Sequence, residues 1–322
     1  MANKNANVLD ARIDEIMEWV VSNPIPTTWR TNSVFPSPGE RKSRSRGSDG
    51  YDFAAHVEYT FEDDPRDIDW FATAATGGQQ VIVEQKFEPR DSRFFVLADV
   101  GTTMGFGSYR TTKRGLATEL TGSIILSAAE TADRVGFVVY DDYSSVHVQQ
   151  PRSAKTVLYP ALASIVQYDE DAINGKIKEP KNKSVTGLQL ALDTVSRYSR
   201  SLVFILSDFM NMTEEDVAML NRVSSHHDVV CIMVQDLRER ELPQGILFGY
   251  GFYTFQDMRT GERKTVWLTP HNRRQFNTNF VNHEKRLIET FQKCDCDWEV
   301  ISTEEGLAAH PKLLQLFANH RK

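Results

Sequence analysis

Four apolar runs that each end on or beside an aspartate constrain the fold of this chain more than any other feature of its sequence. Each run is short and rich in β-branched and aromatic residues, and the first three are followed by segments with apolar residues at helical spacing. Strands that are buried on both faces and alternate with helices are typical of a mainly parallel sheet. The four runs are residues 93–100, 134–142, 201–209 and 228–236.

The remaining segments complete an α/β pattern. A polar stretch rich in Gly, Pro and Ser predicts a loop at 33–51. Apolar spacing predicts helices at 10–21, 111–132, 154–168, 186–199, 213–226, 271–293 and 305–322, a strand at 79–88, a hairpin of 247–256 with 264–269, and a strand at 297–303. We therefore predict a Rossmann-like α/β fold with a mainly parallel central sheet and helices on both faces. Residues 1–90 form an N-terminal extension, and 91–322 form the main domain with its C-terminal hairpin and helix elaboration.

Composition narrows the class of protein. The 322 residues carry a net charge of −7 with a pI near 5.7, which argues against a protein that mainly binds nucleic acid. Three cysteines do not make a disulfide framework in a chain of this length. No apolar run is long enough to span a membrane, and the first residues lack the apolar core of a signal peptide. These features predict a soluble cytoplasmic protein with no membrane attachment.

The acids that follow the strands point to a ligand site. Asp99, Asp141, Asp208 and Asp236 each end, or nearly end, an apolar run. In parallel sheets, ligands bind beyond the carboxyl ends of the strands, so these four acids are expected at one edge. Some of them are expected only to cap the following helix.

Hydroxyl groups near two of these acids suggest a divalent cation. Thr102 and Thr103 closely follow Asp99, Thr186 begins a predicted helix, and Asp208 ends the third strand. Hard cations such as Mg²⁺ prefer oxygen ligands from carboxylates, hydroxyls and water. The sequence therefore predicts a Mg²⁺ or Mn²⁺ site at this edge of the sheet.

This pattern resembles the metal-ion-dependent adhesion site of von Willebrand factor type A domains. That motif has the form Asp-x-Ser-x-Ser, followed by a distant Thr and a distant Asp. Here Asp99 begins the motif, Gly101 stands at the first serine position and Thr103 at the second, followed by Thr186 and Asp208. The resemblance implies that Asp99, Thr103, Thr186 and Asp208 hold the metal. Gly101 lacks a side-chain ligand, and since Mg²⁺ tolerates water in its shell, we expect weakened rather than abolished binding.

A second resemblance covers residues 40–322, nearly the whole chain. The segment "YTFEDDPRDIDW" is similar to a signature of the bacterial and archaeal domain of unknown function number 58, although Glu62 stands where glycine is usual, and Ala75 where arginine is usual. The matching residues are Tyr59, Asp63, Asp64, Arg66, Ile68, Asp69 and Trp70. An architectural role is expected for the segment, with Arg66 paired to Asp63 or Asp69 and Trp70 anchored against the sheet.

The resemblance implies a protein-interaction module and not an enzyme. Proteins of this family often accompany MoxR-type AAA+ ATPases, so a cytoplasmic adaptor between such an ATPase and an unidentified protein client is expected. One alternative is a metal-dependent phosphoryl hydrolase or nuclease that uses Asp99 and Asp208, with Asp141 or Asp236 assisting. Another alternative is a metal-free domain that binds partners through its surface alone.

Overall fold

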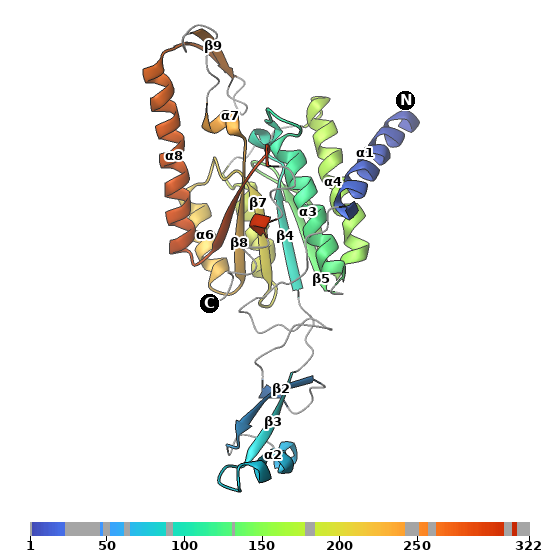
Figure 1. Ribbon diagram of the computed structural model, residues 1–322. Coiled ribbons are helices and arrows are strands. Elements are labelled where there is room, and N and C mark those ends of the chain that lie inside the picture. Colours follow the sequence, from blue (N-terminus) through green and yellow to red (C-terminus); the bar gives the residue numbers. More distant parts are fainter. Residues whose placement is uncertain are drawn as a thin grey trace.

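A six-stranded sheet forms the centre of the molecule in the computed structural model (Figure 1). The model describes residues 2–22, 46–47, 52–60, 65–87, 93–130, 133–177, 184–241, 251–256, 262–305 and 311–313. The strand order is β11-β8-β7-β4-β5-β6, and β6 runs antiparallel to β5 while the other neighbours pair in parallel. The strands are β4 (Arg93–Asp99), β5 (Arg134–Tyr140), β6 (Ser145–Ser153), β7 (Leu202–Ser207), β8 (Asp228–Gln235) and β11 (Asp297–Ser302). The predicted fold class, α/β with a mainly parallel sheet, is confirmed.

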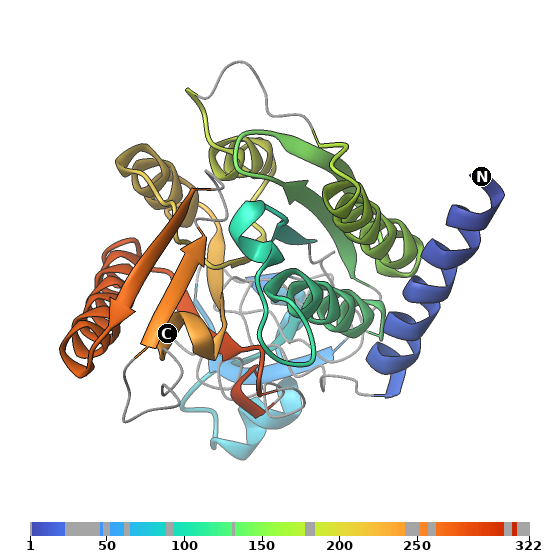
Figure 2. The same cartoon turned by 90° about the horizontal axis from the view of Figure 1, so that it is seen from above.

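Helices cover both faces of this sheet (Figure 2). Successive side chains of a strand point to opposite faces, so Phe94, Val96 and Ala98 of β4 join one buried cluster and Phe95 and Leu97 join the other. The first cluster includes residues of α1 (Ala2–Ser22), α3 (Lys113–Glu130) and α4 (Ala154–Ile173). The second includes residues of α5 (Gly187–Ser196), α6 (Glu214–Ser224) and α8 (Pro270–Lys293).

The carboxyl ends of the four central strands lie at one edge of the sheet. β4, β5, β7 and β8 pair in parallel register, so the residues that follow them meet there. This arrangement confirms the prediction that Asp99, Asp141, Asp208 and Asp236 share an edge of the sheet. The short elements η2 (Thr102–Gly105) and α7 (Leu237–Arg240) follow β4 and β8 at this edge.

A small separate sheet lies at the opposite end of the molecule (Figure 1). Its order is β1-β3-β2, and helix α2 accompanies it. The elements are β1 (Arg46–Gly47), β2 (Asp52–Glu58), η1 (Pro65–Asp67), α2 (Trp70–Ala75) and β3 (Ile82–Phe87). Asp63 and Asp64 lie outside the described residues, and the predicted domain boundary at residue 90 stays a prediction.

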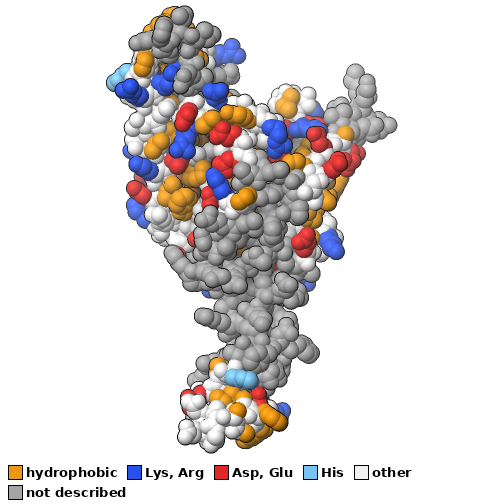
Figure 3. Space-filling model, viewed as in Figure 1, with side chains coloured by type: hydrophobic (Ala, Val, Ile, Leu, Met, Phe, Trp, Pro, Cys, Tyr) orange, Lys and Arg blue, Asp and Glu red, His pale blue; other side chains and the backbone are white. Residues whose placement is uncertain are grey.

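The structure corrects the role expected for Trp70. Asp69 is the N-cap of α2, where its carboxylate accepts from the backbone N–H groups of Phe71 and Ala72 and also contacts His56 at 3.0 Å. At the start of this helix, Trp70 is 69% exposed and Phe71 92% exposed. Trp70 therefore does not anchor the segment against the sheet. Figure 3 shows hydrophobic side chains at the surface of this lower part of the molecule.

A hairpin projects beyond the carboxyl edge of the main sheet (Figure 1). It consists of β9 (Gly251–Gln256) and β10 (Arg263–Leu268), and Phe252 contacts Trp267 across the strands with ring centroids 4.5 Å apart. The hairpin and the helix after it are confirmed, and the first residues of the predicted strand 247–256 lie outside the described residues. The sequence prediction missed β6. Most of the predicted loop 33–51 and of the predicted final helix 305–322 lies outside the described residues.

Candidate functional site

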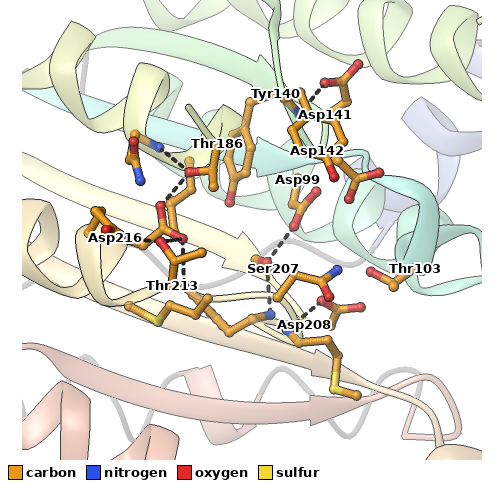
Figure 4. A pocket seen from close by; sticks show the side chains of 18 of the residues that line it. Asp99, Thr103, Tyr140, Asp141, Asp142, Thr186, Ser207, Asp208, Thr213 and Asp216 are labelled. Carbon is orange, nitrogen blue, oxygen red and sulfur yellow. Dashed lines mark hydrogen bonds between the residues drawn. The ribbon is translucent and has the colours of Figure 1, made fainter. Parts of the chain in front are cut away.

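A pocket of about 300 Å³ opens at the carboxyl edge of the sheet (Figure 4). Asp99, Thr103, Thr186 and Asp208 all line it, so the structure brings together the four residues that the sequence predicts as metal ligands. They come from the ends of β4 and β7, from η2 and from the start of α5. Other acids, Asp141, Asp142, Glu215 and Asp216, also line the pocket.

Asp99 is held by two donors inside the pocket. The Ser207 hydroxyl donates to Asp99 Oδ2 at 2.6 Å, and the backbone N–H of Gly101 donates to Oδ1 at 2.7 Å. Burial, followed by repulsion from Asp208 and more weakly from Asp142, nevertheless raises the pKa of Asp99 to about 7. A buried carboxylate with like charges nearby is an environment that a cation would relieve.

Asp208 is positioned by the loop that follows β7. Its Oδ1 accepts from the backbone N–H of Met210 at 3.1 Å. Between them Phe209 adopts a positive φ of 52°, which is uncommon for a bulky residue. Burial of its ring, which meets Phe291 at 5.0 Å, and donation from its N–H to Ser207 hold this conformation.

Asp208 already has a cationic partner, which the sequence analysis did not identify. Lys113, the first residue of α3, is 0% exposed, and its Nζ lies 2.7 Å from Asp208 Oδ2 and 2.7 Å from Glu239 Oε1. Burial alone would lower the pKa of Lys113, but the two carboxylates outweigh burial and raise it. The ammonium therefore balances part of the negative charge from behind the pocket.

Thr186 serves as the N-cap of α5, as expected for a threonine at the start of a helix. Its hydroxyl accepts from the backbone N–H of Gln189 at 3.1 Å and donates to Asp216. Asp216 also forms the capping box of α6 with Thr213. One carboxylate thus joins the starts of two helices, and the proton that Thr186 donates to Asp216 leaves a lone pair of its hydroxyl oxygen available to a cation.

Two of the four acids that end strands have structural roles. Asp141 Oδ1 accepts from the backbone N–H groups of Tyr143 and Ser144, which closes the turn after β5. Asp236 caps α7 and accepts from both Ser108 and Thr303. These bonds lower the pKa of Asp236 although burial acts in the opposite direction. Asp141 therefore closes a turn and Asp236 caps a helix.

The residues fit a divalent cation in part. Among the described residues, no three Asp, Glu, His or Cys side chains are already gathered closely enough to hold a metal ion together. The pocket does supply two carboxylates and the Thr103 hydroxyl, which are hard oxygen donors. It also contains the buried hydroxyl of Tyr140, which has no hydrogen-bond partner. Burial and the charge of Asp99 raise the pKa of this hydroxyl well above its ordinary value, and the nearby Ser207 hydroxyl only partly opposes that shift.

The acid–base groups at the pocket include carboxyl groups, among them Asp99, whose pKa burial raises to about 7. None of the described residues that line the pocket is a histidine, cysteine or lysine. The three cysteines are free and buried, and Cys231 lies inside β8. Among the described residues, no helix is long and apolar enough to cross a membrane.

Comparison with known proteins places these features in a family. The model of the family described as "Protein of unknown function DUF58" matches residues 56–286, which include both α2 and the pocket. Uncharacterized proteins of Mycobacterium tuberculosis (Rv1480) and Mycobacterium bovis (Mb1516) are each 23% identical over 293 residues, covering 90% of this chain and 82% of the relative.

Solved structures also resemble the chain. The conserved hypothetical protein BatB from Bacteroides thetaiotaomicron matches with a TM-score of 0.42 and 12% identity, over 71% of this chain and 100% of that one. An aerotolerance-related membrane protein from Bacteroides fragilis matches with a TM-score of 0.41 and 14% identity, over 70% of this chain and 98% of that one. A von Willebrand factor type A protein from Catenulispora acidiphila matches with a TM-score of 0.31 and 17% identity, over 48% of this chain and 35% of that one.

Proposed function

This chain belongs to the DUF58 family, and we propose that it is a non-enzymatic protein-interaction module that receives its partner at the pocket on the carboxyl edge of the sheet. The observation that supports this proposal most directly is the gathering of Asp99, Thr103, Thr186 and Asp208 around one pocket. The arrangement suits the recognition of a ligand through a bound cation.

A Mg²⁺ or Mn²⁺ ion is the proposed cofactor. Asp99, Thr103, Thr186 and Asp208 would hold it, since the Thr186 hydroxyl can bind an ion through a lone pair while it donates its proton to Asp216. Such an ion would supply a coordination position for an oxygen ligand from a partner. The protein's own part is to keep two carboxylates close together in a buried place, and Lys113 makes this possible by pairing with Asp208.

The partners belong to the proposal as well. A MoxR-type AAA+ ATPase and an unidentified protein client, meeting in the cytoplasm, are the partners that the family resemblance suggests. The exposed Trp70 and Phe71 and the projecting hairpin with Phe252 provide further surfaces for an adaptor that contacts more than one protein.

One observation favours a metal-free variant of the same function. Lys113 already neutralises part of the charge on Asp208, so the pocket has a partial substitute for a cation within its own chain. A hydrolase has less support, because the lining residues described above include no histidine or cysteine.

Affinity capture tests the proposal. Wild-type chain and Asp99→Asn are used as baits in extract of the source organism, with Mg²⁺ and again with EDTA. We expect a specific protein that is retained by wild type with Mg²⁺ and lost with either change. Asp193→Asn removes the same charge from the exposed face of α5 and should retain it. Equal capture by Asp99→Asn, or Mg²⁺-dependent hydrolysis of nucleotide or nucleic acid that Asp99→Ala abolishes, would contradict the proposal.

A further inference from the structure

We propose that Asp142 replaces the ligand hydroxyl that Gly101 lacks, so that the cation site of this chain consists of Asp99, Asp142 and Asp208 with Thr103. This inference rests on the proposed cation site and specifies how it is built. Asp142 follows β5 and was not among the residues predicted from the sequence. The proposal rests on the position of the Asp142 carboxylate beside Gly101.

The space that a side chain at position 101 would use lies between two carboxylates. A Cβ atom built on Gly101 would be 2.9 Å from Asp99 Oδ1 and 2.9 Å from Asp142 Oδ1. Real Cβ atoms essentially never approach other atoms so closely, so these carboxylates already occupy the surroundings of a serine side chain. Gly101 therefore lacks a side chain at the point where Asp142, from the segment after the neighbouring strand β5, places a carboxylate oxygen.

Asp142 is held in this position by bonds that leave one oxygen available. Thr102 donates to Asp142 Oδ2 twice, from its hydroxyl at 2.6 Å and from its backbone N–H at 3.2 Å. The backbone carbonyl of Asp142 accepts from the N–H of Gly187 at 3.1 Å. With Oδ2 and the main chain fixed, Oδ1 is the atom that faces Gly101 and Asp99. Figure 4 shows Asp142 on the same side of the pocket as Asp99.

Tyr140 provides an independent sign that the pocket takes a ligand. The residue is only 2% exposed, it lines the pocket, and its hydroxyl has no hydrogen-bond partner. A buried hydroxyl without a partner is costly, and a ligand or its bound water is the usual way to satisfy one. A hydrated cation between Asp99 and Asp142 would bring water molecules into the pocket beside this hydroxyl.

The carboxylates of the proposed site carry more negative charge than Lys113 balances, which agrees with a divalent cation. Lys113 is the cation paired with this cluster, and its single charge is shared between Asp208 and Glu239. Among the described residues, Asp99 and Asp142 accept hydrogen bonds from the hydroxyls of Ser207 and Thr102 and from backbone N–H groups, all of which are neutral. Thr102 engages only Oδ2 of Asp142, whereas each oxygen of Asp99 and of Asp208 accepts one hydrogen bond. A carboxylate oxygen has a second lone-pair site, so all three groups can still bind an ion, which would draw them closer together than they lie without it.

Titration with Mn²⁺ tests this assignment, with the free ion measured by its electron paramagnetic resonance signal. Asp142→Asn is the central variant, because its amide oxygen can still accept from Thr102 while the negative charge is lost. We expect its Mn²⁺ dissociation constant to rise by about tenfold or more. Asp193→Asn, the exposed control on α5, should stay within about twofold of wild type. Thermal melting in EDTA checks that each variant is folded.

Position 101 gives the complementary test. Gly101→Ser should bind Mn²⁺ more weakly than wild type, because its Cβ crowds Asp99 and Asp142. The double variant Gly101→Ser with Asp142→Ala removes one of the two crowding carboxylates and supplies a serine, so it should bind more tightly than either single variant.

The outcomes separate the two proposals. Wild-type binding that Asp142→Asn leaves unchanged, or Gly101→Ser binding more tightly than wild type, would overturn the role of Asp142 alone. Absence of Mn²⁺ binding by wild type would overturn the cation site itself, and with it the assignment of Asp142.

Discussion

Replacing Lys113 by methionine should strongly destabilise the fold, because it would leave buried carboxylates without their cation. Lys113 is 0% exposed, and Asp208, which it contacts at 2.7 Å, is 4% exposed. Breaking a buried ion pair by removing one partner costs about 3–5 kcal/mol. Glu239, the second partner, is 21% exposed and can recover water, so we expect a loss of about 3 kcal/mol in the free energy of unfolding.

Urea unfolding followed by far-ultraviolet circular dichroism in EDTA provides the measurement. The double variant Lys113→Met with Asp208→Asn removes the unpaired charge together with its partner, so it should recover part of the loss. Arg197→Met breaks the exposed pair with Asp193 and should change the free energy by less than about 0.5 kcal/mol. A Lys113→Met protein within about 0.5 kcal/mol of wild type would refute the reasoning, because the ammonium would then contribute little net stability.

Three further predictions concern pH, packing and the small sheet. The pKa of Asp99 lies near 7 when folded and near 3.8 when unfolded, so the folded state binds the extra proton between these values. Stability in EDTA should therefore fall as pH rises from about 4 to 7, and Asp99→Asn should flatten that part of a melting-temperature profile. Gly187→Ala should cost about 1–3 kcal/mol in urea unfolding, because its Cβ would lie 1.8 Å from the backbone oxygen of the turn after β5. Gly105→Ala, with 3.6 Å to its nearest atom, should cost less, and equal losses would contradict the packing. Asp69→Ala should cost about 1 kcal/mol as a lost helix cap, while Trp70→Ala should stay within about 0.5 kcal/mol, a ranking that hydrogen exchange of α2 can check.

The strands and the edge that they share could be predicted because their signals are local. Each buried strand is a continuous apolar run, and parallel pairing brings its end to a common edge. Asp99 and Asp208 could therefore be placed together from their positions in the sequence. Thr186 could be identified as the start of a helix from the same pattern. β6 was missed because it is a polar edge strand with an alternating burial pattern and few large apolar side chains.

The partners of these residues could not be predicted, because they depend on tertiary contacts. Lys113 begins a helix between polar residues and apolar ones, and nothing local shows that it turns inward toward Asp208. Asp216 contacts Thr186, which begins a different helix 30 residues away in the sequence. The closeness of Asp142 to the position that a side chain at Gly101 would occupy is visible only in the structure. Trp70 was placed wrongly because a large apolar residue need not be buried, and here it is 69% exposed.

Calorimetric titration of the wild-type chain with Mn²⁺, at a pH near 8 where Asp99 is ionised, tests the central claim most directly. The account predicts binding of one ion per chain, which Asp99→Asn and Asp208→Asn each weaken strongly and Asp193→Asn leaves unchanged. Binding that survives both Asp99→Asn and Asp208→Asn, or no binding by wild type at millimolar Mn²⁺, would contradict a cation site at the carboxyl edge of the sheet.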